Sequence, residues 1–131
     1  MIVVDSSALV AIFENEADAA TYAQAIAEAD RLLISAVNAH ETAVVLRARH
    51  GEAAAERFWQ FLENNSFEVI AFDSEQARQA SAAFGRFGKG IHSKAKLNLA
   101  DCAAYALATS LTVPLLFKGD DFTHTDVEQW H

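Results

Sequence analysis

Short apolar runs rich in β-branched residues alternate along the chain with longer segments of helical periodicity. Four runs have the length and composition of buried strands, and they lie at Ile2–Val4, Arg31–Ser35, Phe67–Phe72 and Val113–Phe117. The helical pattern covers Ala8–Phe13, Asp18–Asp30, Ala36–His50, Glu52–Asn64, Asp73 to about Phe87, and Leu97–Leu111. A last short run, Val127–Gln129, predicts an edge strand. The alternation predicts an α/β fold: a three-layer sandwich around a central, mostly parallel sheet of four or five strands.

One glycine-containing segment, Gly85–Lys96, interrupts this pattern and predicts a mobile loop. Between Phe84 and Ala100 the chain has no acidic residue and four basic ones, Arg86, Lys89, Lys94 and Lys96. The whole chain has a net charge of −8, which argues against a generic nucleic-acid binder. An acidic protein with one basic segment can still hold cations in one place and a polyanion in another.

The length and composition exclude several classes of protein. A chain of 131 residues has the size of one domain, spanning residues 1–131. Apolar residues make up 52% and charged residues 21%, which excludes wholesale disorder. The single cysteine excludes an internal disulfide and a cysteine-built zinc site. The N-terminal residues lack the pattern of a secretory signal. No apolar run approaches the ~20 residues that are needed to span a membrane. We therefore expect a cytoplasmic protein without membrane association.

Carboxylates follow two of the predicted strands. Asp5 comes directly after the first strand, and Asp120 and Asp121 come after the fourth. Because ligands of parallel α/β sheets bind outside the carboxyl ends of the strands, these residues are candidates for a site. For each of them a purely structural role stays open as the alternative. Asp5 would cap the following helix, and Asp120 and Asp121 would form an acidic turn.

Two further carboxylates lie among the apolar positions of predicted helices. The stripe around Glu41 consists of Val37, Val44, Val45 and Ala48, and the stripe around Asp101 consists of Leu97, Ala104, Tyr105 and Ala108. A carboxylate that faces a core costs several kcal/mol unless it is paired or binds a metal. A helix N-terminus offsets only about 0.3–1 kcal/mol of this. Pairing with an arginine, or capping a neighbouring element, is the alternative interpretation.

Together these carboxylates form a set of oxygen ligands without cysteine or paired histidine. Such a set favours a hard cation, Mg²⁺ or Mn²⁺. These ions also bind substrate phosphates, so the set indicates phosphodiester or phosphoryl chemistry. The basic segment would supply the phosphate contacts. Phe84 and Phe87 beside it either stack on unpaired bases or pack into the core.

Four segments carry a family resemblance: VVDSSALVAI at the start, SAVNAHETAVVL in the third helix, LNLADCAAYALA in the last helix and LLFKGDDFTHTDV near the end. In this order they resemble the PIN-domain ribonucleases, and most closely the VapC-type toxins of bacterial toxin–antitoxin pairs. GRFGKGIH is similar to the loop before the family's third acidic residue. Each motif alone is weak, but the ordered set spans nearly the whole chain. The resemblance implies a PIN-like fold.

The resemblance also implies metal-dependent hydrolysis of RNA, with one or two Mg²⁺ or Mn²⁺ ions as cofactor. By position, Asp5, Glu41 and Asp101 match the family's first three acidic residues, and Asp121 is the best match for the fourth. Gly119 replaces the first acid of a pair that many relatives carry, which makes Asp120 an accessory candidate.

Several other residues receive candidate roles. Ser7 matches a small hydroxyl residue near the metal, and Lys118 is a candidate contact of the scissile phosphate. The candidates for RNA binding are Arg86, Lys89, His92, Lys94 and Lys96. As partners, the resemblance implies an RNA substrate, a second copy in a homodimer, and a cognate VapB-type antitoxin that occludes the acidic site.

Three rival functions stay open. A receiver-like phosphoacceptor domain would share the sandwich, the Mg²⁺ and a late lysine, here Lys118, but it requires an acidic pair after the first strand. A haloacid-dehalogenase-type phosphatase requires two acids one residue apart there, and Asp5-Ser6-Ser7 lacks the second. The third rival is a catalytically inactive module that binds RNA or a protein.

Overall fold

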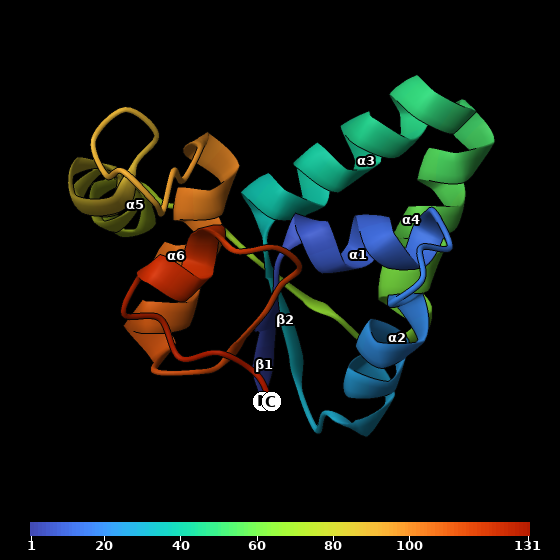
Figure 1. The fold of residues 1–131 in the computed structure, drawn as a ribbon. Helices are drawn as coiled ribbons and strands as arrows, with labels where there is room; N and C mark the ends of the chain where they lie inside the picture. Colours follow the sequence, from blue (N-terminus) through green and yellow to red (C-terminus); the bar gives the residue numbers. More distant parts are fainter.

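The computed structural model describes all 131 residues (Figure 1). Its strands are β1 (Ile2–Val4), β2 (Leu32–Ser35), β3 (Glu68–Ile70) and β4 (Leu115–Leu116). Its helices are α1 (Ser6–Phe13), α2 (Ala19–Glu28), α3 (Ala36–His50), α4 (Glu52–Asn64), α5 (Ser74–Phe87) and α6 (Leu99–Leu111), followed by a 3₁₀ turn η1 (Asp121–His124). The predicted elements are present except the last edge strand, and β3 and β4 are shorter than their apolar runs because only part of each run pairs with a neighbouring strand.

The four strands form one parallel sheet in the order β3-β2-β1-β4. Val3 of β1 pairs with Leu33 of β2 on one side and with Leu115 of β4 on the other. All residues of β1 are buried, as expected for a strand that is covered on both faces. The predicted mostly parallel sheet of four or five strands is therefore confirmed.

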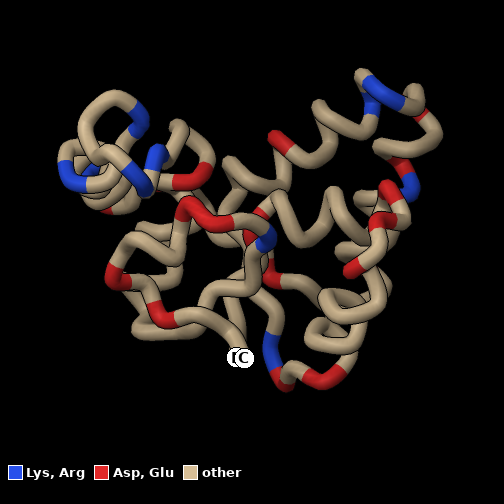
Figure 2. Tube along the Cα trace, viewed as in Figure 1, with Lys and Arg blue, Asp and Glu red and all other residues tan.

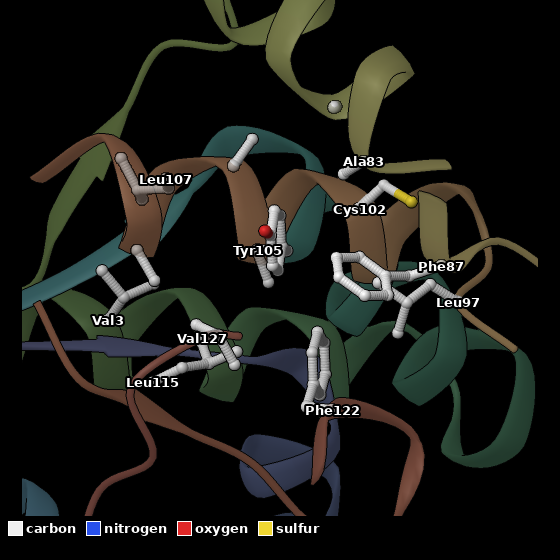
Figure 3. Close-up of a cluster of buried hydrophobic side chains, with 14 of the residues drawn as sticks. Val3, Ala83, Phe87, Leu97, Cys102, Tyr105, Leu107, Leu115, Phe122 and Val127 are labelled. Carbon is white, nitrogen blue, oxygen red and sulfur yellow. The ribbon is translucent and has the colours of Figure 1, made fainter. Parts of the chain in front are cut away.

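Helices cover both faces of the sheet, which gives three layers (Figure 1). Side chains of β1 alternate between the two cores: Ile2 and Val4 pack with α1 to α4, and Val3 packs with α5 and α6. Figure 3 shows the second core, where Phe122 and Val127 of the C-terminal segment lie under α6. None of the helices has the length and apolar character needed to cross a membrane.

The C-terminal segment extends the sheet by a single bridge in place of the predicted edge strand. Leu115 donates its backbone N–H to the carbonyl of Glu128 and accepts the N–H of Trp130. Leu115 pairs with Gln129 in parallel orientation. Because β4 itself has two residues, the segment finds only this short partner before the chain ends.

The buried face of α3 differs from the predicted valine stripe. Its buried residues are Asn38, Ala39, Thr42, Ala43 and Leu46. Val44 is 47% exposed, and Ala48 is exposed as well. Since α3 packs closely against α1, α4 and α6, small and polar side chains face these neighbours, Val44 stays outside, and Val37 and Val45 are only half-buried. The expectation of a core stripe around Glu41 is wrong, and Glu41 is half-buried at the edge of the packed face.

Candidate active site

The candidate residues meet where the order of the strands reverses. The chain passes from β1 outward to β2 and β3, and then returns to the other side of β1 with β4. A crevice forms outside the carboxyl ends of the strands at such a switch point. Asp5 follows β1 at this edge, and the segment 118–121 follows β4. The topology therefore brings together acidic residues from the two ends of the chain.

Asp5 is the most deeply buried candidate carboxylate, with 2% of its surface exposed. It caps α1, because its Oδ2 accepts the backbone N–H of Ser7 at 3.0 Å and also the Ser7 hydroxyl. The hydroxyl oxygen of Ser7 in turn accepts the backbone N–H of Lys118 at 2.9 Å. Asp5 is thus both the cap of α1 and a candidate site residue, and Ser7 connects it to the segment after β4.

A buried amide, Asn38, holds the surrounding elements in place. Its Nδ2 lies 3.1 Å from the Ser6 hydroxyl, 3.1 Å from the Ala100 carbonyl and 3.5 Å from Oδ1 of Asp5. These contacts fix the starts of α1 and α6 against α3. Asn38 was not predicted from the sequence, although an asparagine between apolar neighbours and one turn before Glu41 is a usable signal.

Glu41 and Asp101 approach the same edge from the N-terminal halves of α3 and α6. Glu41 lies one turn after Asn38. Asp101 belongs to a capping box: its Oδ2 accepts the N–H of Asn98 at 2.9 Å, and Oδ1 of Asn98 accepts the N–H of Asp101 at 2.8 Å. The capping box holds the Asp101 side chain at the start of α6.

The candidate carboxylates perturb one another electrostatically. Burial raises the pKa of Asp5 from 3.8 to about 7, and the charges of Asp101 and Glu41 contribute to the rise. Burial also raises the pKa of Asp101 to about 6, with contributions from the charges of Glu41 and Asp121. Like charges have this effect only at short range. Asp5, Glu41, Asp101 and Asp121 therefore form one group, which we call the acidic cluster.

The acidic cluster lacks a protein counter-charge. No lysine, arginine or histidine lies within ion-pair distance of its four carboxylates. Buried charge without a partner is costly, and a set made only of carboxylates favours a hard divalent cation as that partner. No three of the side chains converge closely enough to hold an ion by themselves. Mg²⁺ usually takes one or two carboxylates and keeps several waters, so the donor set fits a hydrated cation.

Two of the basic candidates are engaged with other carboxylates. Nζ of Lys118 pairs with Glu16 and, at 3.1 Å, with Asp18 of the segment between α1 and α2. Arg86 pairs with Asp126 at 3.4 Å. A role of either side chain at an RNA phosphate stays a prediction.

The remaining candidates are exposed or half-buried. Lys89, Lys94 and Lys96 are exposed on the loop between α5 and α6, and His92 on the same loop is half-buried. Asp120 is exposed and precedes η1, where its carbonyl accepts the N–H of Thr123. Of the two neighbouring aromatics, Phe87 packs into the core and Phe84 is 39% exposed.

Comparison with known proteins assigns the family. A model of the PIN domain matches residues 2–128. The chain belongs to the PIN-domain family. Within this family it is similar to Ribonuclease VapC28 of Mycobacterium tuberculosis, with 41% identity over 127 residues that cover 97% of this chain and 96% of VapC28. Ribonuclease VapC of Mycolicibacterium smegmatis is 42% identical over 129 residues, with coverage of 98% and 99%. This PIN-domain protein is therefore a member of the VapC ribonucleases.

Solved structures share the fold of this PIN-domain protein. VapC20 of Mycobacterium tuberculosis, a sarcin-ricin loop cleaving toxin, superposes with a TM-score of 0.83 at 17% identity, covering 99% of this chain and 98% of VapC20. A toxin–antitoxin complex from Klebsiella pneumoniae has a TM-score of 0.73 at 20% identity, with coverage of 96% and 93%. The predicted PIN-like fold is confirmed, and family membership decides against the receiver-like and phosphatase-like rivals.

Proposed function

We propose that residues 1–131 form one nuclease unit that hydrolyses RNA phosphodiester bonds with Mg²⁺ or Mn²⁺, as the toxin of a toxin–antitoxin pair. The main support for this proposal is the acidic cluster, which places four carboxylates at the switch point of the sheet without a protein counter-charge. Family membership supports it, because relatives over nearly the full length of the chain are named ribonucleases. VapC nucleases of the PIN-domain family need a divalent metal ion.

The carboxylates of the acidic cluster would hold one or two such ions. A divalent cation supplies a Lewis acid that stabilises charge on phosphate oxygens and lowers the pKa of a bound water. Ser7 orients Asp5 by donating to its Oδ2, and Asn98 orients Asp101. We assign Ser7 a positioning role and Asp120 an accessory role beside Asp121.

We also propose a VapB-type antitoxin and a second copy of this chain as partners. Structural neighbours of this PIN-domain protein include a DNA-bound VapBC from Salmonella typhimurium and the toxin–antitoxin complex from Klebsiella pneumoniae. A net charge of −8 and an acidic cluster without a cationic neighbour suit an inhibitor segment that carries a basic side chain.

Cleavage of RNA by purified protein free of antitoxin tests the proposed function. Total RNA is incubated with Mg²⁺, with Mn²⁺ and with EDTA, and the products are compared between wild type and the Asp101→Asn and Glu41→Gln variants. We expect discrete products with either ion and none in EDTA. Each variant should cut at least about a hundredfold more slowly, because several kcal/mol of transition-state stabilisation depend on the ion site.

Glu63→Gln is the matched control, since Glu63 is an exposed carboxylate on α4 outside the acidic cluster. It should cut like wild type. Equal cleavage by wild type and Asp101→Asn would assign the activity to a contaminant and overturn the proposal. A wild type that binds Mn²⁺ and RNA but cuts no RNA would favour the rival of an inactive binding module.

A further inference from the structure

The loop between α5 and α6 carries a group of lysines beside the acidic cluster. We call residues 88–98 the lysine loop; it contains Lys89, Lys94 and Lys96. The chain has no acidic residue between Glu75 and Asp101. In Figure 2, the loop with its blue segments leads into the red segment at the start of α6.

The lysine loop is folded back on itself at its base. Lys89 donates its N–H to the carbonyl of Leu97 at 2.9 Å, and Leu97 donates to the carbonyl of Phe87 at 3.0 Å. Ala95 and Leu97 are fully buried, with 0% exposure. The glycine-rich composition predicted a mobile segment, but these bonds and buried anchors hold both ends of the loop against α5 and the core.

A histidine shapes the far part of the loop. Nδ1 of His92 accepts the backbone N–H of Lys94 at 3.0 Å and that of Ala95 at 2.9 Å. The ring packs against Phe87, with 6.0 Å between the ring centroids. The His92 side chain thus fixes the backbone that carries Lys94. A hollow of about 480 Å³ lies beside it, lined by Lys89, Gly90, Ile91, His92, Ser93 and Lys96.

The three lysines of the loop are free of carboxylate partners. Four of the ten basic residues, Arg31, Arg49, Arg86 and Lys118, pair with carboxylates elsewhere in the molecule. Three of the other six lie in the lysine loop. Lys96 precedes Asp101 by five residues, and Asn38 holds the start of α6 next to Asp5. Half of the unpaired basic residues therefore lie in one loop, which leads into the start of α6.

We propose that the lysine loop binds the phosphates of single-stranded RNA beside the acidic cluster, and that His92 is the residue that positions its lysines. The proposal rests on the proposed ribonuclease function. A protein of net charge −8 repels RNA in general, so a local cationic surface is needed to bring the strand to the carboxylates. Arg86 lies outside this loop, near the end of α5, where its guanidinium pairs with Asp126.

RNA binding is measured in the Asp101→Asn background, so that binding does not depend on cleavage. The probe is a labelled single-stranded RNA of mixed sequence, and its Kd is determined by fluorescence anisotropy over a series of salt concentrations. Replacing Lys89, Lys94 and Lys96 with glutamine should weaken binding about tenfold. The slope of log K against log salt should fall by about 2, since each phosphate contact with single-stranded RNA contributes about 0.7.

The matched control replaces the other three unpaired basic residues, Arg47, Arg57 and Arg78, with glutamine. It changes the net charge by the same amount. His92→Ala should reproduce most of the loss of affinity, whereas His92→Asn should restore binding because asparagine also carries an acceptor atom at the δ position. Circular dichroism melts of all variants identify any that fail to fold, and only folded variants are compared.

Each outcome of these measurements either supports or overturns the proposed RNA-binding role of the lysine loop. Loss of RNA affinity in the loop variant alone supports the lysine loop as the binding surface. Equal losses in loop and control variants, or no loss in either, overturn it. A loop variant that binds RNA normally but no longer binds the antitoxin assigns the loop to the protein partner and also overturns it. If His92→Ala binds like its parent, the positioning role of His92 is wrong. Wild-type cleavage, measured separately, reports on the ribonuclease function.

Discussion

At the scale of single residues, Asp5 combines two roles with opposite consequences for stability. As a helix cap it accepts two hydrogen bonds from Ser7, which favour its ionised form. Burial and the charges of Asp101 and Glu41 outweigh these bonds and raise the pKa of Asp5 to about 7. Without a cation, this carboxylate therefore destabilises the folded protein at neutral pH, and a divalent ion would remove that cost.

Asp5→Asn should therefore stabilise the metal-free protein at high pH. The pKa is 3.8 in the unfolded chain and about 7 in the folded protein, so the contribution of Asp5 to stability is full below pH about 4 and is lost as the pH rises through about 7. Asparagine keeps the cap and does not ionise. Above pH about 7 the variant should be more stable by on the order of 2–4 kcal/mol.

Denaturant unfolding in EDTA at several pH values measures this difference. It should disappear below pH about 4, where wild-type Asp5 is neutral in both states. Asp120→Asn, at an exposed position, serves as the control and should change little at any pH. A difference between Asp5→Asn and wild type that does not vary with pH would contradict the assignment to a buried charge.

At the scale of elements, the segment after β4 is connected to α1 in two ways. The backbone N–H of Lys118 donates to Ser7 and so supports Asp5. Its ammonium group pairs with Glu16 and Asp18, which lowers the pKa of Asp18 and raises that of Lys118. The backbone contact therefore reaches the acidic cluster, and the side chain is directed to the segment between α1 and α2.

Lys118→Gln should reduce RNA cleavage by no more than about threefold, because exposed ion pairs contribute little and the backbone N–H remains. Ser7→Ala should reduce cleavage by about tenfold, because it removes the hydroxyl that orients Asp5. Single-turnover cleavage rates compare the two variants with wild type. A loss of a hundredfold or more in Lys118→Gln would show instead that the ammonium group leaves Glu16 and Asp18 to contact the substrate.

At the scale of the whole molecule, charge is separated into an acidic cluster without a cationic partner and a lysine loop without an acidic one (Figure 2). The lysine loop leads directly into α6, which carries Asp101 of the acidic cluster, although the net charge of −8 suggests a uniformly acidic surface. Ions that bind only the folded chain shift the unfolding equilibrium toward it.

Mn²⁺ or Mg²⁺ should therefore raise the melting temperature relative to EDTA. At an ion concentration of about 100 times Kd, the gain is about 2.7 kcal/mol, which corresponds to a shift of about 5 °C or more for a chain of this size. The shift should shrink in Asp101→Asn and persist in Glu63→Gln. Differential scanning fluorimetry measures it, and an equal shift in all three proteins would place the ions outside the acidic cluster.

The amino-acid sequence by itself determined the elements and most of the acidic candidates. Strands and helices depend on local periodicity, and caps such as Asp73 act on the residues that follow them. Asp5 and Asp121 could be identified because strand ends are visible in the pattern. Asp101 stood out because a carboxylate interrupts an apolar helix, and α6 is indeed buried along most of its length.

Only the tertiary structure decided which faces are packed and which charges are paired. Asn38 and Ala100 are 62 residues apart, and Ser7 and Lys118 are 111 apart, so no local pattern reveals these contacts. Val44 of α3 proved exposed because small and polar residues face the neighbouring helices and allow them to approach more closely. Arg86 and Lys118 found carboxylates from distant segments. Hydrophobic periodicity and helix capping depend on residues that are close in sequence. Burial and ion pairing depend on distant segments that meet only when the chain has folded.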